Sequence, residues 1–153
     1  MLVGLISDTH GLLRPNAIEA LRGSDLIIHA GDVGKGEIIE SLAQIAPVKA
    51  VRGNIDKGDW AEALPNTQVI TAGSAVIYAL HDLNQIDLDP AAAGFHIVVS
   101  GHSHKPESYE RNGVLYINPG SAGPRRFKLP ITVVWLDLEK KPWEPEFIEL
   151  SPD

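Results

Sequence analysis

Residues 2–32, LVGLISDTHGLLRPNAIEALRGSDLIIHAGD, decide the fold of this 153-residue chain. The almost entirely apolar run at 2–6 predicts a buried strand, and the apolar run at 25–30 predicts a second one. Between them, Pro15 stands at a suitable first helical position, and the apolar residues of 15–21 lie on one helical face. A strand, a helix and a strand in this order predict parallel strands joined by a right-handed crossover.

The rest of the chain continues as alternating short elements. Apolar residues at helical spacing predict a second helix at 37–46, and an apolar run predicts a third strand at 47–52. An N-cap Asp and a terminal Gly predict a short helix at 89–94. The loop at 119–130, with its prolines, glycines and basic residues, is expected on the surface. Further strands are predicted at 74–80, 96–100, 114–118, 131–138 and 146–150, the last two joined as a hairpin across 139–143.

Composition narrows the function classes. The formal net charge of -7 predicts no general nucleic-acid binding, and the absence of cysteine excludes disulfides, zinc fingers and thiol nucleophiles. No apolar run approaches the roughly 20 residues of a membrane helix, and the first residues do not read as a signal peptide. We therefore expect one domain over residues 1–153, located in the cytoplasm and without a membrane partner.

Side chains that can bind a metal ion follow five of the apolar runs. Because ligands bind beyond the carboxyl ends of strands in α/β sheets, we expect these side chains to converge on one rim. Seven are too many for one ion and suit two, and two divalent ions are the usual machinery for hydrolysing phosphate esters. The seven are Asp8, His10, Asp32, Asn54, His81, His102 and His104.

The same positions form an ordered set of short motifs. In chain order they are DTH at 8–10, GD at 31–32, GN at 53–54, His81 and GHSH at 101–104, followed by NPGS at 118–121. This set resembles the calcineurin-like metallophosphoesterases, in particular the small bacterial and archaeal phosphodiesterase members. The resemblance implies an α/β fold that is a four-layer α-β-β-α sandwich, with two mixed sheets packed face to face and helices outside.

The resemblance also implies how the side chains divide between two metal ions. These ligands suit divalent Mn best, with Fe, Zn, Ni or Co as alternatives. A hydroxide bridging the ions would attack phosphorus in line with the leaving oxygen, and the Asn54 amide would stabilise phosphoryl charge. Asp32 and Asn54 are therefore the candidate catalytic residues. One ion would take Asp8, His10, Asp32 and His104, and the other Asp32, Asn54, His81 and His102, with Asp32 bridging the two.

Two positions depart from the family pattern. Many members have His directly after the Asn of the GN motif, where it is thought to protonate the leaving group, and here that position is Ile55. Since Ile55 cannot transfer a proton, we expect better activity on aryl or otherwise activated esters than on alkyl esters. The second departure is Asp82, where small members often have Gly. Asp82 either orients His81 through a hydrogen bond or faces solvent.

Three further side chains stay open between substrate binding and a structural role. Arg52 directly precedes the GN motif, and this position gives it a claim to phosphate contact. Asp56 either caps a turn or contacts the site. His29 lies in an apolar strand and is better explained as a core histidine or as a support for the ligands.

The sequence favours an enzyme over a protein-binding scaffold. We expect a divalent-metal-dependent phosphodiesterase that acts on a small phosphoester or nucleotide-like substrate at an open site. The alternative is a scaffold that keeps the fold and the metal ligands with little catalysis, because relatives of this fold serve as a subunit of the retromer. Retention of all seven ligands favours the enzyme. Exposed strand edges leave a homo-oligomer open.

Overall fold

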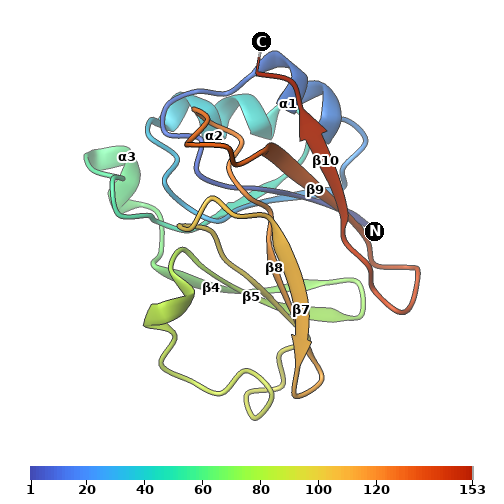
Figure 1. The fold of residues 1–153 in the computed structure, drawn as a ribbon. Coiled ribbons are helices and arrows are strands. Elements are labelled where there is room, and N and C mark those ends of the chain that lie inside the picture. The colour runs from blue at the N-terminus through green and yellow to red at the C-terminus, as the bar shows by residue number, and fades with distance from the viewer. Residues whose placement is uncertain (153) are drawn as a thin grey trace.

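Two five-stranded mixed sheets pack face to face in the computed structural model, which describes residues 1–152 (Figure 1). The strand order is β10-β9-β1-β2-β3 in the first sheet and β4-β5-β6-β8-β7 in the second. The first sheet contains β1 (Leu2–Ile6), β2 (Leu26–His29), β3 (Val48–Ala50), β9 (Ile131–Asp137) and β10 (Glu146–Leu150). The second contains β4 (Thr67–Ala72), β5 (Ala75–Leu80), β6 (Ile97–Val99), β7 (Glu107–Arg111) and β8 (Val114–Asn118).

Parallel strands form the centre of each sheet. In the first sheet β1 and β3 both pair in parallel with β2, and in the second β5 and β8 both pair in parallel with β6. Antiparallel strands complete the sheets, β9 and β10 in the first and β4 and β7 in the second. The two mixed sheets, the parallel opening strands and the β9–β10 hairpin predicted from the sequence are thus confirmed.

The core between the sheets is apolar and fully buried. Val3 and Leu5, two residues apart on β1, face it together with Ile28 of β2 and with Ile77 and Val99 of the second sheet. This arrangement follows from the strand period of two residues, which sends alternate side chains to the same face. Each such side chain stabilises the fold by about 1.5–3 kcal/mol through its removal from water.

Two helices, α1 (Pro15–Leu21) and α2 (Gly36–Ala43), cover the outer face of the first sheet (Figure 1). Leu21 and Leu42 of these helices pack in one cluster with Ile27 of β2. The next residue, Ile28, faces the core between the sheets. The helices therefore hold the first sheet from outside, and the loops that connect them to the strands are anchored at both ends.

The outer face of the second sheet is covered by the segment 83–95, which begins with the 3-10 turn η1 (Leu83–Gln85). The prediction of a helix at 89–94 is wrong, although the predicted capping contact exists: Asp89 Oδ1 accepts the N–H of Ala91 at 3.1 Å. The chain makes one hydrogen-bonded turn there and stops. Residues 91–94 are exposed, so no apolar face is buried that would stabilise a longer helix.

Four elements have no counterpart in the prediction from sequence, and one of them is the turn η1. β4 and β7 are edge strands: half of the β4 residues and most of the β7 residues are exposed, with polar residues among them, so neither shows the apolar run of a buried strand. The helix α3 (Asp59–Glu62) is a single turn. The remaining predicted elements are present, with ends shifted by a few residues.

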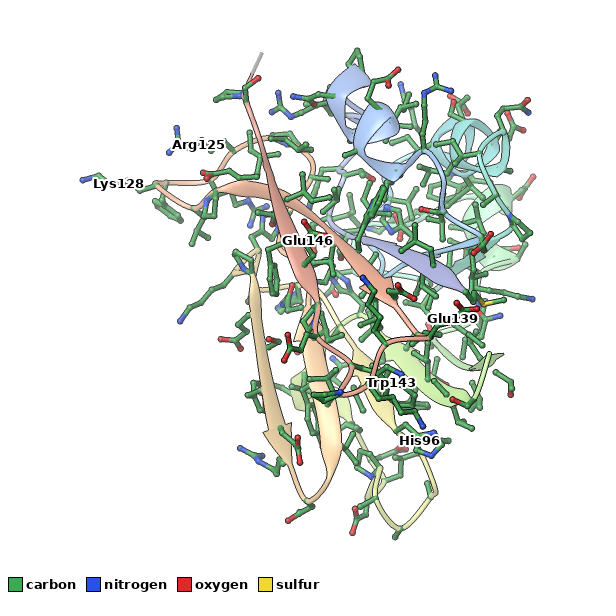
Figure 2. All side chains as sticks on the ribbon, turned by 90° about the vertical axis from the view of Figure 1, so that its right-hand side faces the viewer. His96, Arg125, Lys128, Glu139, Trp143 and Glu146 are labelled. Carbon is green, nitrogen blue, oxygen red and sulfur yellow. The ribbon has the colours of Figure 1, made fainter. Side chains whose placement is uncertain are left out.

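The loop at 119–130 begins inside the molecule and ends outside it. Residues 119–123 are buried, whereas 124–128 are exposed. Figure 2 shows Arg125 and Lys128 pointing away from the body of the protein, so the surface position predicted for this loop holds for its basic part. Among residues 1–152, the helices are too short and too polar for any of them to cross a membrane.

Candidate metal centre

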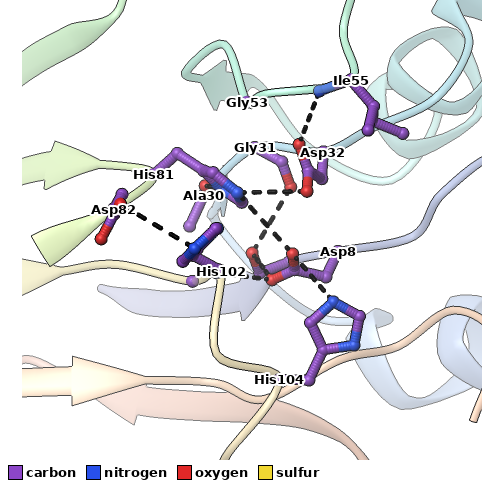
Figure 3. A network of polar contacts seen from close by, with 12 residues as sticks. Asp8, Ala30, Gly31, Asp32, Gly53, Ile55, His81, Asp82, His102 and His104 are labelled. Atoms are coloured by element: carbon purple, nitrogen blue, oxygen red, sulfur yellow. Dashed lines mark hydrogen bonds and ion pairs between the residues drawn. The ribbon is translucent and has the colours of Figure 1, made fainter. Parts of the chain in front are cut away.

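The candidate ligands lie on loops that follow central strands of both sheets. Asp8 and Asp32 follow β1 and β2, and His81 and His102 follow β5 and β6. Figure 3 shows these four side chains gathered at the rim where the two sheets meet. The loops of both sheets therefore contribute to one cluster of carboxylates and imidazoles.

Most of the candidate ligands have a left-handed backbone. Within residues 1–152, only two other non-glycine residues, Asn112 and Phe127, share this conformation. Sparsely populated backbone conformations cost about 1–3 kcal/mol each and persist where the surrounding structure holds them, commonly at functional sites. The five ligands with a positive φ are Asp8 (55°), His10 (46°), Asp32 (56°), His102 (73°) and His104 (63°).

Three histidine rings surround one oxygen of Asp8. Asp8 Oδ1 lies 3.4 Å from His104 Nε2, 3.7 Å from His10 Nε2 and 3.9 Å from His81 Nε2. Asp8, His10 and His104 form one group in which the ligand atoms all lie within 4.8 Å of one another. This group is three members of the set predicted for the first ion.

Asp32 connects this group to His81. Its Oδ2 lies 3.2 Å from His81 Nε2 and 3.5 Å from His10 Nε2, while its Oδ1 accepts the N–H of Ile55 at 3.1 Å. Asp8, Asp32 and His81 form a second group whose ligand atoms also lie within 4.8 Å of one another. Both carboxylates thus lie among the histidines, and the bridging role of Asp32 stays a prediction.

A hydrogen bond determines which nitrogen of His81 is available as a ligand. His81 Nδ1 lies 2.7 Å from the carbonyl oxygen of Ala30, and a carbonyl can only accept, so Nδ1 carries the hydrogen. In the neutral ring Nε2 then carries the lone pair, on the side that faces Asp32 and Asp8. The backbone directly after β2 therefore orients a candidate ligand that follows a strand of the second sheet.

Buried polar atoms of the centre lack hydrogen-bond partners. They are Asp8 Oδ1, His10 Nε2, His81 Nε2 and His104 Nδ1. An unsatisfied buried polar atom costs about 1–3 kcal/mol, so four in one place are unfavourable unless another group satisfies them. Carboxylate and imidazole are ligands that borderline divalent ions accept, so this donor set fits divalent metal ions.

The pKa values of the central groups shift in directions that suit a cation site. Burial alone would raise the pKa of Asp8, but contacts with His10 and His104 outweigh it and hold this pKa well below its usual range. Burial also acts to raise the pKa of Asp32, and the contact with His81 reverses the direction. Conversely, burial acts to lower the pKa of His81, and the two carboxylates raise it. Both carboxylates are therefore anionic at neutral pH.

Asn54 and His102 lie at the rim, outside the two tight groups. The His102 side chain is 44% exposed, and its ring centroid lies 5.3 Å from that of His81. Asn54 is exposed in the turn after β3 and lines a pocket together with His81. The structure thus brings five of the seven predicted ligands into two groups and places these two beside His81.

Asp56 and Arg52 hold the turn that presents Asn54. Asp56 is buried, and its carboxylate accepts the N–H groups of Gly34 at 2.9 Å and Gly53 at 2.8 Å. Arg52 Nε donates to the carbonyl oxygen of Asp56 at 3.1 Å. Of the two readings of Asp56, the structure therefore supports the turn, and Arg52 both holds this turn and lines the pocket beside it.

His29 supports the ligand loops from within the first sheet. Its Nδ1 accepts the N–H of Gly31 at 3.1 Å, so Nε2 carries the hydrogen and donates to Thr9 Oγ1 at 3.1 Å. Thr9 Oγ1 in turn donates to the carbonyl oxygen of Val33 at 2.7 Å. Complete burial lowers the pKa of His29 to about 4, so the ring is neutral at physiological pH. His29 is a core histidine that holds residues next to the ligands.

Three polar residues behind the ligands were missed by the sequence analysis. Ser7 Oγ donates to Asp8 Oδ2 at 2.6 Å, and Ser121 Oγ donates to the Asp8 carbonyl oxygen at 3.0 Å. Asn118 Nδ2 donates to the carbonyl oxygen of Gly101 at 3.0 Å. The sequence signal for two of them was the run of Asn, Pro, Gly and Ser at 118–121, which carries no indication of these contacts.

Two pockets border the centre and share Asp82 as a common wall. One has a volume of about 180 Å³ and includes His102 in its lining. The other has a volume of about 370 Å³ and is lined in part by Arg52, Asn54 and His81. The surface beside the centre is therefore hollowed on either side of Asp82.

Comparison with known proteins gives a family match over most of the chain. The family model described as the calcineurin-like phosphoesterase superfamily domain matches residues 1–141. A probable metallophosphoesterase of Methanothermobacter thermautotrophicus is 33% identical over 153 residues, which covers 92% of this chain and 88% of that protein.

Solved structures share the fold along nearly the whole chain. An archaeal phosphodiesterase is 25% identical, with a TM-score of 0.78 over 98% of this chain and 100% of that one. Vps29 from Entamoeba histolytica, in a complex with Zn²⁺, is 22% identical, with a TM-score of 0.74 over 97% of this chain and 99% of that one. The likeness to Vps29 is one of fold alone.

Proposed function

The chain belongs to the calcineurin-like phosphoesterase superfamily, and from this premise we propose that it is a divalent-metal-dependent phosphodiesterase. The observation that carries the proposal is the set of buried polar atoms without hydrogen-bond partners on the candidate ligands Asp8, His10, His81 and His104. Buried polar groups in proteins are normally satisfied, so exceptions gathered at one rim call for a ligand.

The proposed ligand set is the one that the family resemblance implies. Two divalent ions would supply Lewis-acid activation of water and neutralise charge on the phosphoryl oxygens. The proposed metal is Mn first, with Fe, Zn, Ni or Co as alternatives, because imidazole, amide and carboxylate ligands accept all of them. The first ion would be held by Asp8, His10, Asp32 and His104, and the second by Asp32, Asn54, His81 and His102.

The chain's own residues orient the substrate around these ions. Asp8 and Asp32 are anionic and supply the negative charge that retains the cations. The Asn54 amide lies at the pocket beside His81, where it can donate a hydrogen bond to a phosphoryl oxygen. Arg52 lines the same pocket, and its terminal guanidinium nitrogens suit charge-assisted hydrogen bonds to an anionic ester.

The two pockets favour a diester over a monoester. A phosphodiester has two organic substituents, and the pockets on either side of Asp82 provide a place for each. The acidic walls contributed by Asp82, Asp87 and Glu107 also disfavour a second negative charge on the substrate. We propose a small or nucleotide-like phosphodiester as the substrate class and the cytoplasm as the location.

Hydrolysis of bis(p-nitrophenyl) phosphate tests this function. Protein stripped with a chelator should be inactive and should regain activity with Mn²⁺. Asp32→Asn, which keeps the size of the side chain and removes its charge, should lose at least about 100-fold in kcat because both ions lose the shared negative charge and an amide offers one oxygen in place of two. Asp59→Ala, at an exposed carboxylate of α3, should match the wild type. A folded wild type without activity under Mn²⁺, Fe²⁺, Co²⁺, Ni²⁺ and Zn²⁺ would contradict the proposal.

The alternative function is that of a protein-binding scaffold. It is favoured by the fold shared with Vps29, a protein that has been solved in a complex with Zn²⁺. Metal binding alone therefore does not separate the two functions, and turnover does. Tight binding of two ions by a protein that hydrolyses neither diesters nor monoesters would favour the scaffold.

A further inference from the structure

Asp82 lies between the two pockets and faces a different histidine from the one that precedes it in sequence. Its Oδ2 lies 3.8 Å from His102 Nε2, as Figure 3 shows. Its Oδ1 accepts the N–H of Asn84 at 3.0 Å and so caps the turn η1. One carboxylate oxygen is thus engaged by the backbone, which holds the side chain in place, and the other is directed at His102.

His102 needs a partner that orients its ring. It is the most exposed of the candidate histidine ligands, whereas His81 is buried and is oriented by the carbonyl of Ala30. A histidine that binds a metal through one nitrogen usually donates the N–H of the other to a carboxylate or carbonyl, which fixes the tautomer and the ring direction. Asp82 is placed where such a carboxylate would stand for His102.

We propose that Asp82 is a positioning residue that accepts the Nε2–H of His102 and thereby directs Nδ1 of His102 to the second metal ion. The inference rests on the two-ion centre proposed above. It names the ligating nitrogen of His102, which differs from the Nε2 that His81 offers, and it gives a role to the residue at which this chain departs from the family pattern. A carboxylate partner also raises the basicity of the ligand, so the second ion should be held more tightly.

The capping contact supplies the competing explanation, and two variants separate the roles. Asp82→Ser keeps a side-chain oxygen for the cap but is too short to reach His102. Asp82→Asn keeps its single side-chain oxygen for the cap and turns an amide NH2 group toward His102, so it lacks an acceptor for the Nε2–H. Asp89→Ser is the matched control, because Asp89 also caps a turn of the covering segment and lies outside both pockets.

Titration calorimetry of the metal-free protein with Mn²⁺ tests the proposal without any measurement of turnover. The wild type should bind two ions. Asp82→Ser should bind one of them about 10–100-fold more weakly and the other as the wild type does. Asp82→Asn should show a comparable loss at the same ion, and Asp89→Ser should show none. The visible spectrum of the Co²⁺-loaded protein should change in both Asp82 variants and not in Asp89→Ser, because a ligand of one ion is misplaced.

Three results would overturn the inference. Wild-type affinity for both ions in Asp82→Ser would show that Asp82 serves the cap alone. Equal weakening of both ions, with a lower melting temperature of the metal-free variant, would show a general effect on the fold. A wild type that binds fewer than two ions would remove the premise, and this failure is visible before any variant is measured. Metal binding as expected with no hydrolysis of any ester would instead contradict the proposed enzyme and leave the role of Asp82 supported.

Discussion

Ile55 affects the site in two separate ways, through its backbone N–H and through its side chain. Its backbone N–H donates to Asp32 Oδ1 at 3.1 Å and so holds the central carboxylate. Its side chain is 44% exposed and contributes no proton donor. Because the backbone contact does not depend on the side chain, another residue at this position should leave the geometry of Asp32 intact.

Replacement of Ile55 by His should restore a general acid beside the centre. General acid catalysis typically contributes 10²–10⁴-fold, and poor leaving groups need it most. Ile55→His should therefore raise kcat for alkyl phosphodiesters by at least about 10-fold, with little change for p-nitrophenyl esters. Rates for a series of leaving groups of increasing pKa measure this, and Ile55→Gln is the control for polarity without proton transfer. Equal gains by the two variants, or a wild type that hydrolyses alkyl and aryl esters alike, would contradict this role of Ile55.

Among the elements, the turn at 53–56 connects β3 to the centre and leaves no space for a side chain at Gly53. Gly53 lies so close to Asp32 that a Cβ added to it would stand 2.1 Å from the Asp32 backbone nitrogen. The buried carboxylate of Asp56 closes the turn through the N–H groups of Gly53 and Gly34. The position of Asn54 is thus set by backbone contacts of its neighbours.

Removal of the Asp56 carboxylate should damage both stability and activity. In Asp56→Ala two partly buried N–H groups lose their acceptor, and water can reach them in part, so the pair costs about as much as one fully buried unsatisfied group, about 1–3 kcal/mol. The free energy of unfolding should fall by about that amount, as measured by urea denaturation, and kcat on an aryl diester should fall because Asn54 moves. Asp59→Ala, three residues further along the chain and exposed, should change neither quantity. Loss of stability with unchanged kcat would contradict the prediction that this turn positions Asn54 for catalysis.

For the whole molecule, the centre joins the two sheets at their common rim. Asp8 and Asp32 follow strands of the first sheet, and His81, His102 and His104 follow strands of the second. Ions bound by both sets, as proposed above, would therefore connect the sheets in the folded state and would lose this site when the chain unfolds. Metal binding and global stability are consequently linked.

Removal of metal should lower the melting temperature of the whole protein. A ligand present at 100 times its Kd stabilises the folded state by about 2.7 kcal/mol, and about 1 kcal/mol shifts Tm by roughly 2–4 °C at this size. A chelator should therefore lower Tm by about 5–10 °C relative to protein in excess Mn²⁺. Asp32→Asn should show a much smaller difference between the two conditions. A wild type with the same Tm in both would contradict a metal link between the sheets.

Much of this architecture can be predicted locally from the sequence. The central strands are apolar because both of their faces are buried, so they stand out as runs, and the polar residue after each run marks the rim. The edge strands β4 and β7 escaped prediction because exposed strands carry no such run. The helix expected at 89–94 failed for the opposite reason: its capping signal is real, but packing supplies nothing to bury.

The residue types of the centre and their order along the chain can be predicted from the sequence, because strand ends and motif spacing are local properties. How those residues face one another depends on the folded chain. The tertiary structure placed Asp8 among three histidine rings, assigned the hydrogen of His81 to Nδ1 through Ala30, and turned Asp82 toward His102, although the sequence left only His81 or solvent open for it. The contacts of His81 with Asp8 and Ala30, and of His104 with Asp8, join residues from the two sheets, and the packing of the sheets against each other is a property of the whole chain.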